Sequence, residues 1–561
     1  MTQDPIITWK DWQDGIADSP HLGHALLQGA ETDTFTGAAR VAKLPATAFQ
    51  AATASTFTAV AATDICTGAT FTTSANTTQT AVTLTTTGTL PAGLSTGTNY
   101  FVIRVDQGAG TFKLATTIAN ANVPTPIDIT DAGTGTHTVT TVDPGTINHY
   151  AVDPRTSTTF AMDSNGRVWY AQTGTPPYLL LNGNTLTNAS GQGVAVFRTS
   201  DGNATYLFAF RNALLDVVNV YGATQLETPS WTNGWKSLNT GAGSAGSHHA
   251  ILGQDNIVYF CDDRYVGSIL EKAGQVFNPA DAATYTYNNQ ALDLPLGLLT
   301  YWLEQLGINL LISVSNGSDI YPWDRSSDSY GLPIPVGEYA LNKMKNIGNV
   351  VYVLAGTRGN IYWTQGTYVR SFKTIPLYLT NNVGTAASNP ITWGGIASAN
   401  GKLIVGVGAL SGRSGVYMLD PQGRVTLDNV PSTGAARVTA LYATTDFYQM
   451  GYAAGADTMG TTRYSALGTV ILQSALYRVG NKTEKATVSE IEYQIANGVA
   501  GSIRVGYRTD LTSSFTEITT FTTATTATSD YFDAGLTDLE NIQFQAELSG
   551  NIDLMEIRVF K

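Results

Sequence analysis

The sequence predicts an all-β protein organised around a β-propeller of about six to eight blades. One phrase recurs: a run of alternating apolar and polar residues, a turn built on Gly, Asn or Asp, and a second run that ends in an aromatic residue. Clear copies lie at 158–171, 248–263, 303–324, 344–364 and 396–420, and weaker copies at 193–220 and 438–467. The copies start roughly 35 to 55 residues apart, which favours propeller blades over shorter helical repeats.

The runs inside each phrase have the length and composition of strands. Residues 349–355 and 402–407 crowd β-branched and aromatic side chains between Gly and Asn, and such runs are too short for helices. The turns at 164–166, 316–318 and 400–401 contain residues that tolerate the positive φ of tight hairpins. A single blade cannot bury both of its faces, so we expect the blades to stack around one axis over residues 143–467.

The composition limits the classes of function. The chain has 561 residues, with 30 Lys and Arg against 43 Asp and Glu, and a formal charge of −13. This balance argues against a surface that grips DNA, although an acidic wall would let DNA slide past, and ordinary solubility also explains the charge. No apolar run approaches the length of a membrane span and no signal peptide is evident, so we expect synthesis in the cytoplasm without membrane insertion.

Residues 1–57 are expected to form an extended or briefly helical lead-in that lies along another surface and assists assembly. His21 and His24 have the spacing of a metal pair, but zinc needs three or four ligands, so we expect loop histidines. Residues 15–47 place a short polar introduction and a Gly-containing turn before a propeller. This layout resembles the opening of nozzle or tail-tubular proteins of short-tailed bacteriophages.

Residues 58–142 are rich in Thr, Ala and Gly and are predicted to form a small β-sandwich inserted at a loop tip. Its strands are predicted at 80–86, 99–106 and 111–115. The phrases LPAGL, YFV, GTFKLATT and AGTGTHTV follow one another between residues 90 and 139, and they resemble a module of many bacteriophage tail and head proteins. The alternative is a low-complexity Thr-rich linker, against which the apolar strand at 100–103 argues.

Residues 468–561 are predicted to form an antiparallel β-sandwich. Period-2 alternation marks four short strands, at 491–495, 502–507, 543–548 and 555–560. The phrases IRVGYRTDLTSSFTEI and IQFQAELSGNIDLMEIRV resemble the C-terminal sandwich of phage tail proteins that also contain propellers. Two separate segments therefore imply a virion.

The sequence predicts no active site, metal site or cofactor site. The six histidines fall in none of the HExxH, GxSxG, P-loop or EF-hand spacings. Asp262 and Asp263 are adjacent on one strand and point to opposite faces, so a blade-closing turn explains them better than a glycosidase pair. Glu304, Asp319 and Glu338 lie among aromatic residues and could flank a sugar, but coincidences are common among 43 carboxylates.

The remaining candidates are isolated side chains. Trp231, Trp235 and Trp323 are possible glycan contacts, because flat indole rings stack on sugars. The competing interpretation, which we favour, is that they pack between neighbouring blades. Cys66 and Cys261 stand far apart and are predicted to be small buried apolar residues.

The resemblance implies a structural tail protein rather than an enzyme. Copies of the chain would form a ring, hexameric in nozzle proteins, that lines or extends the conduit for DNA ejection. The ring would contact the tail adaptor or connector and other tail proteins, and DNA would pass without specific binding. The alternative is a receptor-binding tail fibre or tailspike that holds host surface glycan, and a third is a cellular propeller scaffold.

Overall fold

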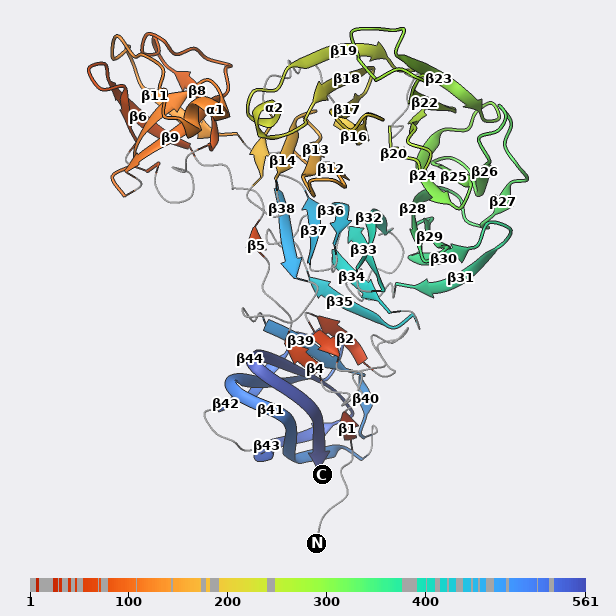
Figure 1. Ribbon diagram of the computed structural model, residues 1–561. Coiled ribbons are helices and arrows are strands. Elements are labelled where there is room, and N and C mark those ends of the chain that lie inside the picture. The colour runs from red at the N-terminus through yellow and green to blue at the C-terminus, as the bar shows by residue number, and fades with distance from the viewer. Residues whose placement is uncertain are drawn as a thin grey trace. The chain divides into compact units, whose positions relative to one another are not determined.

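The chain folds into two compact units made almost entirely of strands (Figure 1). The first comprises residues 1–46, 335–450 and 457–561, and the second comprises residues 47–334 and 451–456. The computed structural model describes residues 7–9, 24–28, 30–32, 39–41, 46–47, 54–68, 70–71, 79–106, 108–142, 145–172, 178–181, 191–239, 248–375, 391–399, 401–408, 414–420, 423–429, 437–444, 447–452, 455–460, 469–480, 484–511, 513–523 and 529–560.

The second unit contains four antiparallel sheets in which four consecutive strands pair in chain order. The first two sheets are β12 (Ile147–Val152), β13 (Thr159–Asp163), β14 (Val168–Ala171) and β15 (Leu179–Leu180), then β16 (Gly191–Arg198), β17 (Thr205–Arg211), β18 (Leu214–Asn219) and β19 (Trp231–Ser237). The next two are β20 (Ala250–Leu252), β21 (Val258–Asp262), β22 (Tyr265–Glu271) and β23 (Tyr285–Asp293), then β24 (Thr300–Leu306), β25 (Asn309–Val314), β26 (Asp319–Trp323) and β27 (Ile334–Pro335). A short helix, α2 (Ala223–Glu227), precedes β19.

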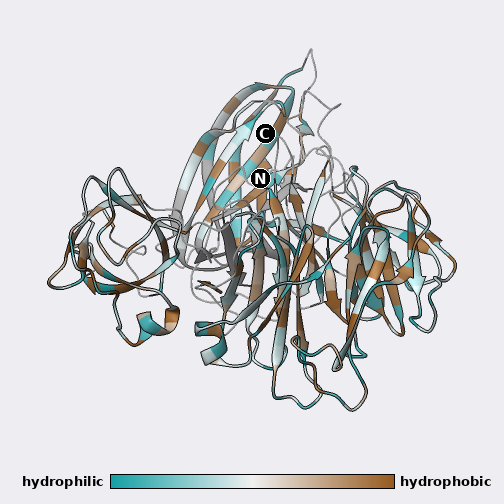
Figure 2. Ribbon diagram, turned by 90° about the horizontal axis from the view of Figure 1, so that it is seen from above, coloured by the Kyte–Doolittle hydropathy of each residue, from teal (hydrophilic) through white to brown (hydrophobic). Residues whose placement is uncertain are grey.

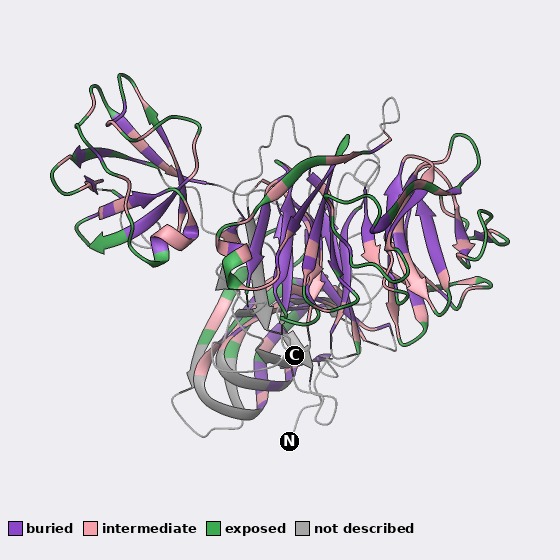
Figure 3. Ribbon diagram, turned by 45° about the horizontal axis from the view of Figure 1, so that its top comes forward, coloured by how far each residue is buried: buried purple, intermediate pink, exposed green. Residues whose placement is uncertain are grey.

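Neighbouring sheets of the second unit share their apolar cores. One buried cluster joins Phe208 and Phe210 to Phe260, and a second joins Tyr259 to Leu303 and its neighbours. Figure 3 shows buried residues along the blade strands and exposed residues in their loops, and Figure 2 shows hydrophobic stretches on the same strands. Each sheet therefore buries its faces against the next, as the repeat predicts for propeller blades.

The first unit contains further groups of four strands. They are β28 (Leu341–Ile347), β29 (Val350–Ala355), β30 (Asn360–Thr364) and β31 (Val369–Thr374), then β32 (Thr392–Ala399), β33 (Lys402–Gly408), β34 (Gly415–Leu419) and β35 (Val425–Asn429). The last sheet consists of β36 (Val438–Ala443), β37 (Phe447–Tyr452), β38 (Gly455–Gly460) and β5 (Ala46–Thr47). The described strands thus make seven groups of four, and the predicted all-β propeller fold is confirmed.

A β-bulge recurs in the first strand of five of these groups. It falls between Ile147 and His149, Gly191 and Gly193, Thr300 and Trp302, Leu341 and Lys343, and Trp393 and Gly395. A bulge bends its strand and re-aims the side chain beside it. The first strand of each of these five groups therefore presents one specially placed residue.

The Thr-rich module is a closed barrel rather than the predicted sandwich, and it begins at Ala54. Its strands are β6 (Ala54–Val60), β7 (Ile65–Thr67), β8 (Ala81–Thr86), β9 (Tyr100–Asp106), β10 (Thr111–Ala115) and β11 (His137–Thr141), with α1 (Ile118–Asn122) between β10 and β11. The barrel closes because β11 pairs with both β6 and β8, and β10 pairs with both β7 and β9. The rings of Phe57 and Phe71 pack on Phe112 inside it, which excludes a Thr-rich linker.

The four predicted C-terminal strands are joined in pairs. The strands observed are β39 (Thr469–Ser474), β40 (Tyr477–Arg478), β41 (Ala486–Arg508), β42 (Thr516–Thr523), β43 (Ser529–Leu539) and β44 (Asn541–Phe560). Strands β41 and β44 pair along most of their length, with register shifts between Gln494 and Ala500 and with Gly501 opposite Gly550. The Gly and Asn residues between the predicted strands lie within two long bent strands, because a bulge absorbs them without ending the pairing.

The described parts of residues 1–57 pair within the chain, which corrects the expectation of a lead-in along another surface. They form β1 (Ile7–Trp9), β2 (His24–Gln28), β3 (Ala30–Thr32) and β4 (Ala39–Val41). Strands β1 and β4 pair with β44, whereas β2 pairs with β39 on one side and with β35 on the other. Strand β2 therefore joins the C-terminal strands to a propeller blade in one 14-stranded sheet.

We expect Trp9→Ala to destabilise the first unit by about 3 to 5 kcal/mol, because it removes a large side chain from a packed core. Trp9 is 1% exposed and belongs to the same buried cluster as Ile557. Urea unfolding followed by circular dichroism measures the change. Tyr339→Ala in the same unit is the control, since that ring is 68% exposed. Equal effects of the two substitutions would contradict the role of β1.

Candidate functional site

In the second unit the first strands of three blades, two of them bulged, bring three rings together. His149 lies in β12, His249 directly precedes β20, and Trp302 lies in β24. The His249 ring stacks on Trp302 with centroids 3.5 Å apart, and the His149 ring lies 4.8 Å from His249 and 5.9 Å from Trp302. The first strands lie on the inner side of their blades (Figure 1), so we name these three residues the inner cluster.

Both histidines of the inner cluster bind the backbone of the following blade. The N–H of Val194 donates to Nδ1 of His149 at 3.3 Å, and the N–H of Leu303 donates to Nδ1 of His249 at 3.0 Å. His149 is 8% exposed and His249 is 3% exposed. A ring nitrogen that accepts such a bond holds no proton, so this geometry uses the neutral imidazole. The histidines therefore act as braces between blades.

At two other bulges a glycine allows the backbones of neighbouring blades to come into direct contact. A Cβ at Gly193 would overlap the carbonyl oxygen of His248, and a Cβ at Gly394 would overlap that of Val438. At both positions the backbone of the following blade occupies the space that a Cβ atom would need, so only glycine fits. At the bulges, His149 is therefore a brace, whereas Gly193 and Gly394 leave space for a neighbouring backbone.

Lys343 is the brace in the first unit. Its Nζ donates to the carbonyl oxygens of Gly394 and Thr439, the latter at 2.9 Å, and thereby joins β28 to two other blades. The side chain is buried, and desolvation lowers its pKa from the ordinary 10.5 to about 7. The amine therefore changes charge near neutral pH while its hydrogen-bond acceptors stay fixed.

A second titratable group lies at the hairpin that follows β21. Asp262 is fully buried and accepts hydrogen bonds from the N–H of Asn239 at 2.7 Å and from its Nδ2 at 2.9 Å. Burial raises the pKa of Asp262 to about 7. Asp263 has φ 60° in the turn itself, so the predicted blade-closing turn is confirmed.

His248 is buried beside Asp262, and both of its ring nitrogens face backbone carbonyl oxygens. Its Nδ1 lies 2.8 Å from the carbonyl oxygen of Cys261, and its Nε2 lies 3.2 Å from that of Asn212. Burial lowers the pKa of His248, although both carbonyl oxygens favour the protonated ring. Cys261 and Cys66 are buried as predicted, and burial raises the pKa of the Cys66 thiol to about 12, so neither is a ready nucleophile.

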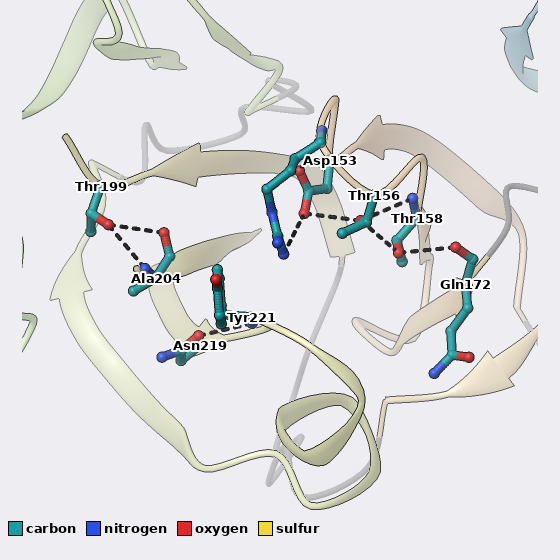
Figure 4. Close-up of polar contacts among 9 residues, drawn as sticks. Asp153, Thr156, Thr158, Gln172, Thr199, Ala204, Asn219 and Tyr221 are labelled. Carbon is teal, nitrogen blue, oxygen red and sulfur yellow. Dashed lines mark hydrogen bonds and ion pairs between the residues drawn. The ribbon is translucent and has the colours of Figure 1, made fainter. Parts of the chain in front are cut away.

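Further carboxylates cap hairpin turns. Figure 4 shows Asp153 between β12 and β13, where it accepts from the N–H of Arg155 at 2.9 Å and from Oγ1 of Thr156 at 3.0 Å. The Arg155 guanidinium in turn lies 4.3 Å from the ring centroid of Tyr221. In such a turn the carboxylate accepts hydrogen bonds from groups of the turn itself.

One of these turns recurs with a sequence signature that our prediction missed. The motif D-x-x-G-R-V begins at Asp163 and again at Asp420. The N–H of Arg167 donates to Asp163 at 2.8 Å, and the N–H of Arg424 donates to Asp420 at 2.9 Å. Trp169 adds an indole hydrogen bond to Asp163 at 3.0 Å. Counting motifs of Asp, Gly and Arg across the repeats would have revealed it.

The three tryptophans predicted as possible glycan contacts differ in how far they are buried. Trp323 is 4% exposed and donates from its indole nitrogen to the carbonyl oxygen of Ser327 at 2.6 Å, so it offers no open ring face to a sugar. Trp235 is half-buried and packs against Phe208 and Phe277, which belong to two neighbouring blades and their loops. Packing between blades therefore explains these two residues, whereas Trp231 is half-buried on β19 and stays a prediction.

A groove of about 470 Å³ with a mixed polar and apolar lining lies beside these blades, between the turn after β16 and the loop after β22. Ser200, Asp255, Asn256 and Glu271 line it, with Lys272 and Val276 in the loop. Glu271 accepts from the N–H groups of Ser200 at 2.9 Å and Phe277 at 2.6 Å. Its carboxylate therefore holds the two loops together.

The other sequence candidates are divided between the two units. Glu338 accepts hydrogen bonds from Asn360 and from the Tyr362 hydroxyl and belongs to the first unit, whereas Glu304 and Asp319 belong to the second. His21 lies outside the described residues. Within the described ranges, no group of three His, Cys, Asp or Glu side chains is arranged to hold a metal ion. No helix in the described part of the chain is long and apolar enough to cross a membrane.

Comparison with known proteins supports no assignment beyond fold. No protein-family model and no curated protein sequence matches the chain. Similar solved structures include YCF48 bound to D1 peptide (11% identity, TM-score 0.39, 57% of this chain and 95% of that chain) and the β-propeller domain of Myceliophteria thermophila Cps50 (Swd1) (9%, 0.41, 57% and 99%). Another is virginiamycin B lyase from Staphylococcus aureus (10%, 0.37, 57% and 98%). At these values no argument about function follows, and the strands themselves define an all-β propeller protein.

Gly193→Ala tests the close approach of neighbouring blades. We expect it to lower the free energy of unfolding by about 1 to 3 kcal/mol, because the added methyl group must displace a backbone carbonyl. Gly331→Ala is the matched control, since its Cβ would only touch Pro322 at 3.4 Å. Thermal unfolding of both variants measures the difference. If Gly193→Ala unfolds like the control, the blades are packed less tightly than described.

Lys343 should make stability depend on pH. Between pH 7 and 10.5 the unfolded chain binds more protons than the folded chain at this residue, so the unfolding free energy should rise with pH. The rise is about 1.4 kcal/mol per pH unit within that window. Lys343→Met should lose this slope in urea unfolding between pH 7 and 9. Lys345→Met, on the same strand but half-buried, should keep it.

Proposed function

We propose that this protein is a structural component of a bacteriophage tail, a ring-forming, nozzle-like protein that lines or extends the conduit for DNA ejection. The main supporting observation is the use of the blades' polar residues. His149, His249, Lys343 and Asp163 all bind backbone groups of their own or a neighbouring blade. These residue types are catalytic in many enzymes, but in this protein their polar atoms form hydrogen bonds with the propeller backbone.

Two further features support this proposal. The barrel and the C-terminal strands contain the sequence phrases that resemble phage virion modules, and both fold into closed or continuous β-structure. The second unit has 20 Asp and Glu against 10 Lys and Arg between residues 47 and 334. An acidic wall repels DNA phosphates, so DNA would pass without specific binding. Copies of the chain and the tail adaptor or connector are the expected partners, in the virion tail.

The second candidate is a receptor-binding tail protein that holds host surface glycan. The groove beside β22, together with half-buried Trp231, favours it. Asp255 and Asn256 could bind sugar hydroxyl groups there. Binding of host envelope polysaccharide that Asn256→Ala abolishes would support this candidate over the structural one.

Light scattering of the purified protein, alone and with isolated tail or connector fractions, tests the structural proposal. We expect a ring of several copies that binds those fractions, or a monomer that assembles on them. Bovine serum albumin in place of the fractions is the control for non-specific adsorption. A monomer or trimer that ignores the fractions and adheres to host polysaccharide would contradict the proposal.

A further inference from the structure

The charges of the chain are strongly segregated along the sequence. No Asp or Glu occurs between Glu338 and Asp420, and that stretch contains seven Lys and Arg although the whole chain has a charge of −13. The basic residues are Lys343, Lys345, Arg358, Arg370, Lys373, Lys402 and Arg413. They fall in the first unit, mainly on the blade β28–β31. This blade is therefore a basic element in an acidic protein.

The strand register places basic and aromatic residues in one row across this blade. Lys345 pairs with Tyr352, Tyr352 pairs with Trp363, and Trp363 pairs with Arg370. Residues directly opposite each other in antiparallel strands project from the same face. Arg370 is exposed and the other three are half-buried. We name these four residues the basic row.

Arg370 is held in place by rings. Its guanidinium carbon lies 5.7 Å from the Trp363 centroid and 4.9 Å from that of Tyr368, which is 46% exposed. Among the described residues, Arg370 and Lys402 have no carboxylate partner. An exposed guanidinium supported by Trp and Tyr is the composition of interaction hot spots. The basic row is therefore suited to a carboxylate-bearing partner.

The second unit offers such carboxylates at one end of its blades. Asp201 follows the first strand of its blade, and Asp281, Asp324 and Asp328 follow the third strands of theirs. All four are exposed. Turns after the first and third strands of an antiparallel blade lie at the same end. Hydrogen bonds within their turns lower the pKa of Asp201 and Asp324, so both are ionised at neutral pH.

We propose that the basic row of one copy binds the acidic loop end of the second unit of another copy. Such a contact joins different surfaces, so it can repeat around a ring, and it deepens the proposed function by supplying the interface that a ring requires. Nucleic acid fits the row less well. Tyr352 packs edge-on against Phe372 at 5.0 Å, and the Arg370 guanidinium lies over Trp363, so neither ring is an open platform for a base.

Charge reversal in the full-length chain tests this contact. Sedimentation velocity of the wild type should show self-association that weakens between 50 and 500 mM NaCl. Arg370→Glu alone and Asp328→Lys alone should each weaken association at least about tenfold, and mixing the two variants should restore it through the reversed pair. Arg358→Glu is the matched control, since Arg358 lies in the turn after the second strand, at the other end of the blade.

Each outcome decides the inference. Wild-type protein that stays monomeric at all salt concentrations, or Arg370→Glu that associates like Arg358→Glu, would overturn it. Binding of a duplex DNA oligonucleotide that Arg370→Glu abolishes, without self-association, would assign the row to nucleic acid instead. Isolated tail fractions distinguish this contact from the proposed tail function. Protein that self-associates but does not bind the fractions supports the contact and contradicts the tail function. A strictly monomeric chain that binds the fractions supports the tail function and contradicts the contact.

Discussion

The bulge in the first strand of a blade is the constraint on which the propeller packing depends. It aims one residue at a neighbouring blade, where that residue reaches a backbone group, makes room for one or, at Trp302, stacks on a ring. At the bulges His149 accepts a backbone N–H group, Lys343 donates to two carbonyls, and Gly193 leaves space for a carbonyl. His249, directly before the regular strand β20, accepts a backbone N–H group in the same way. These residues contact the backbone of a neighbouring blade. The residue type that fits each position therefore depends on where that neighbouring backbone runs, and not on the strand that contains the residue.

This constraint explains why the fold was more predictable than the site. Alternating runs and Gly or Asn turns are local signals, and they predicted the blades and the barrel strand Thr111–Ala115 at its observed bounds. The use of His249 as a brace depends on Leu303, which lies 54 residues further along the chain. Nothing in the sequence around His249 distinguishes a brace from a ligand. The pairing of residues distant in the chain supplies that information.

Long-range pairing also explains the misread C-terminal strands and the barrel. Gly501 and Gly550 lie in the gaps between the four predicted short strands, but they face each other across a continuous bent ladder. Closure of the barrel depends on β11 pairing with two strands that are distant in sequence. The burial of Trp323 likewise depends on Ser327 and Tyr259, so the same indole that suggested a sugar platform became part of a core.

The closing ladder of the barrel has an evolutionary consequence. Its first and last strands are neighbours, with Ala54 opposite Thr140, so the chain enters and leaves the barrel at adjacent points. A module with this geometry can be gained, lost or exchanged by recombination while the host chain needs only a short join across the gap. Related proteins are therefore expected to differ by whole cassettes at this position, with the propeller sequence continuing on either side.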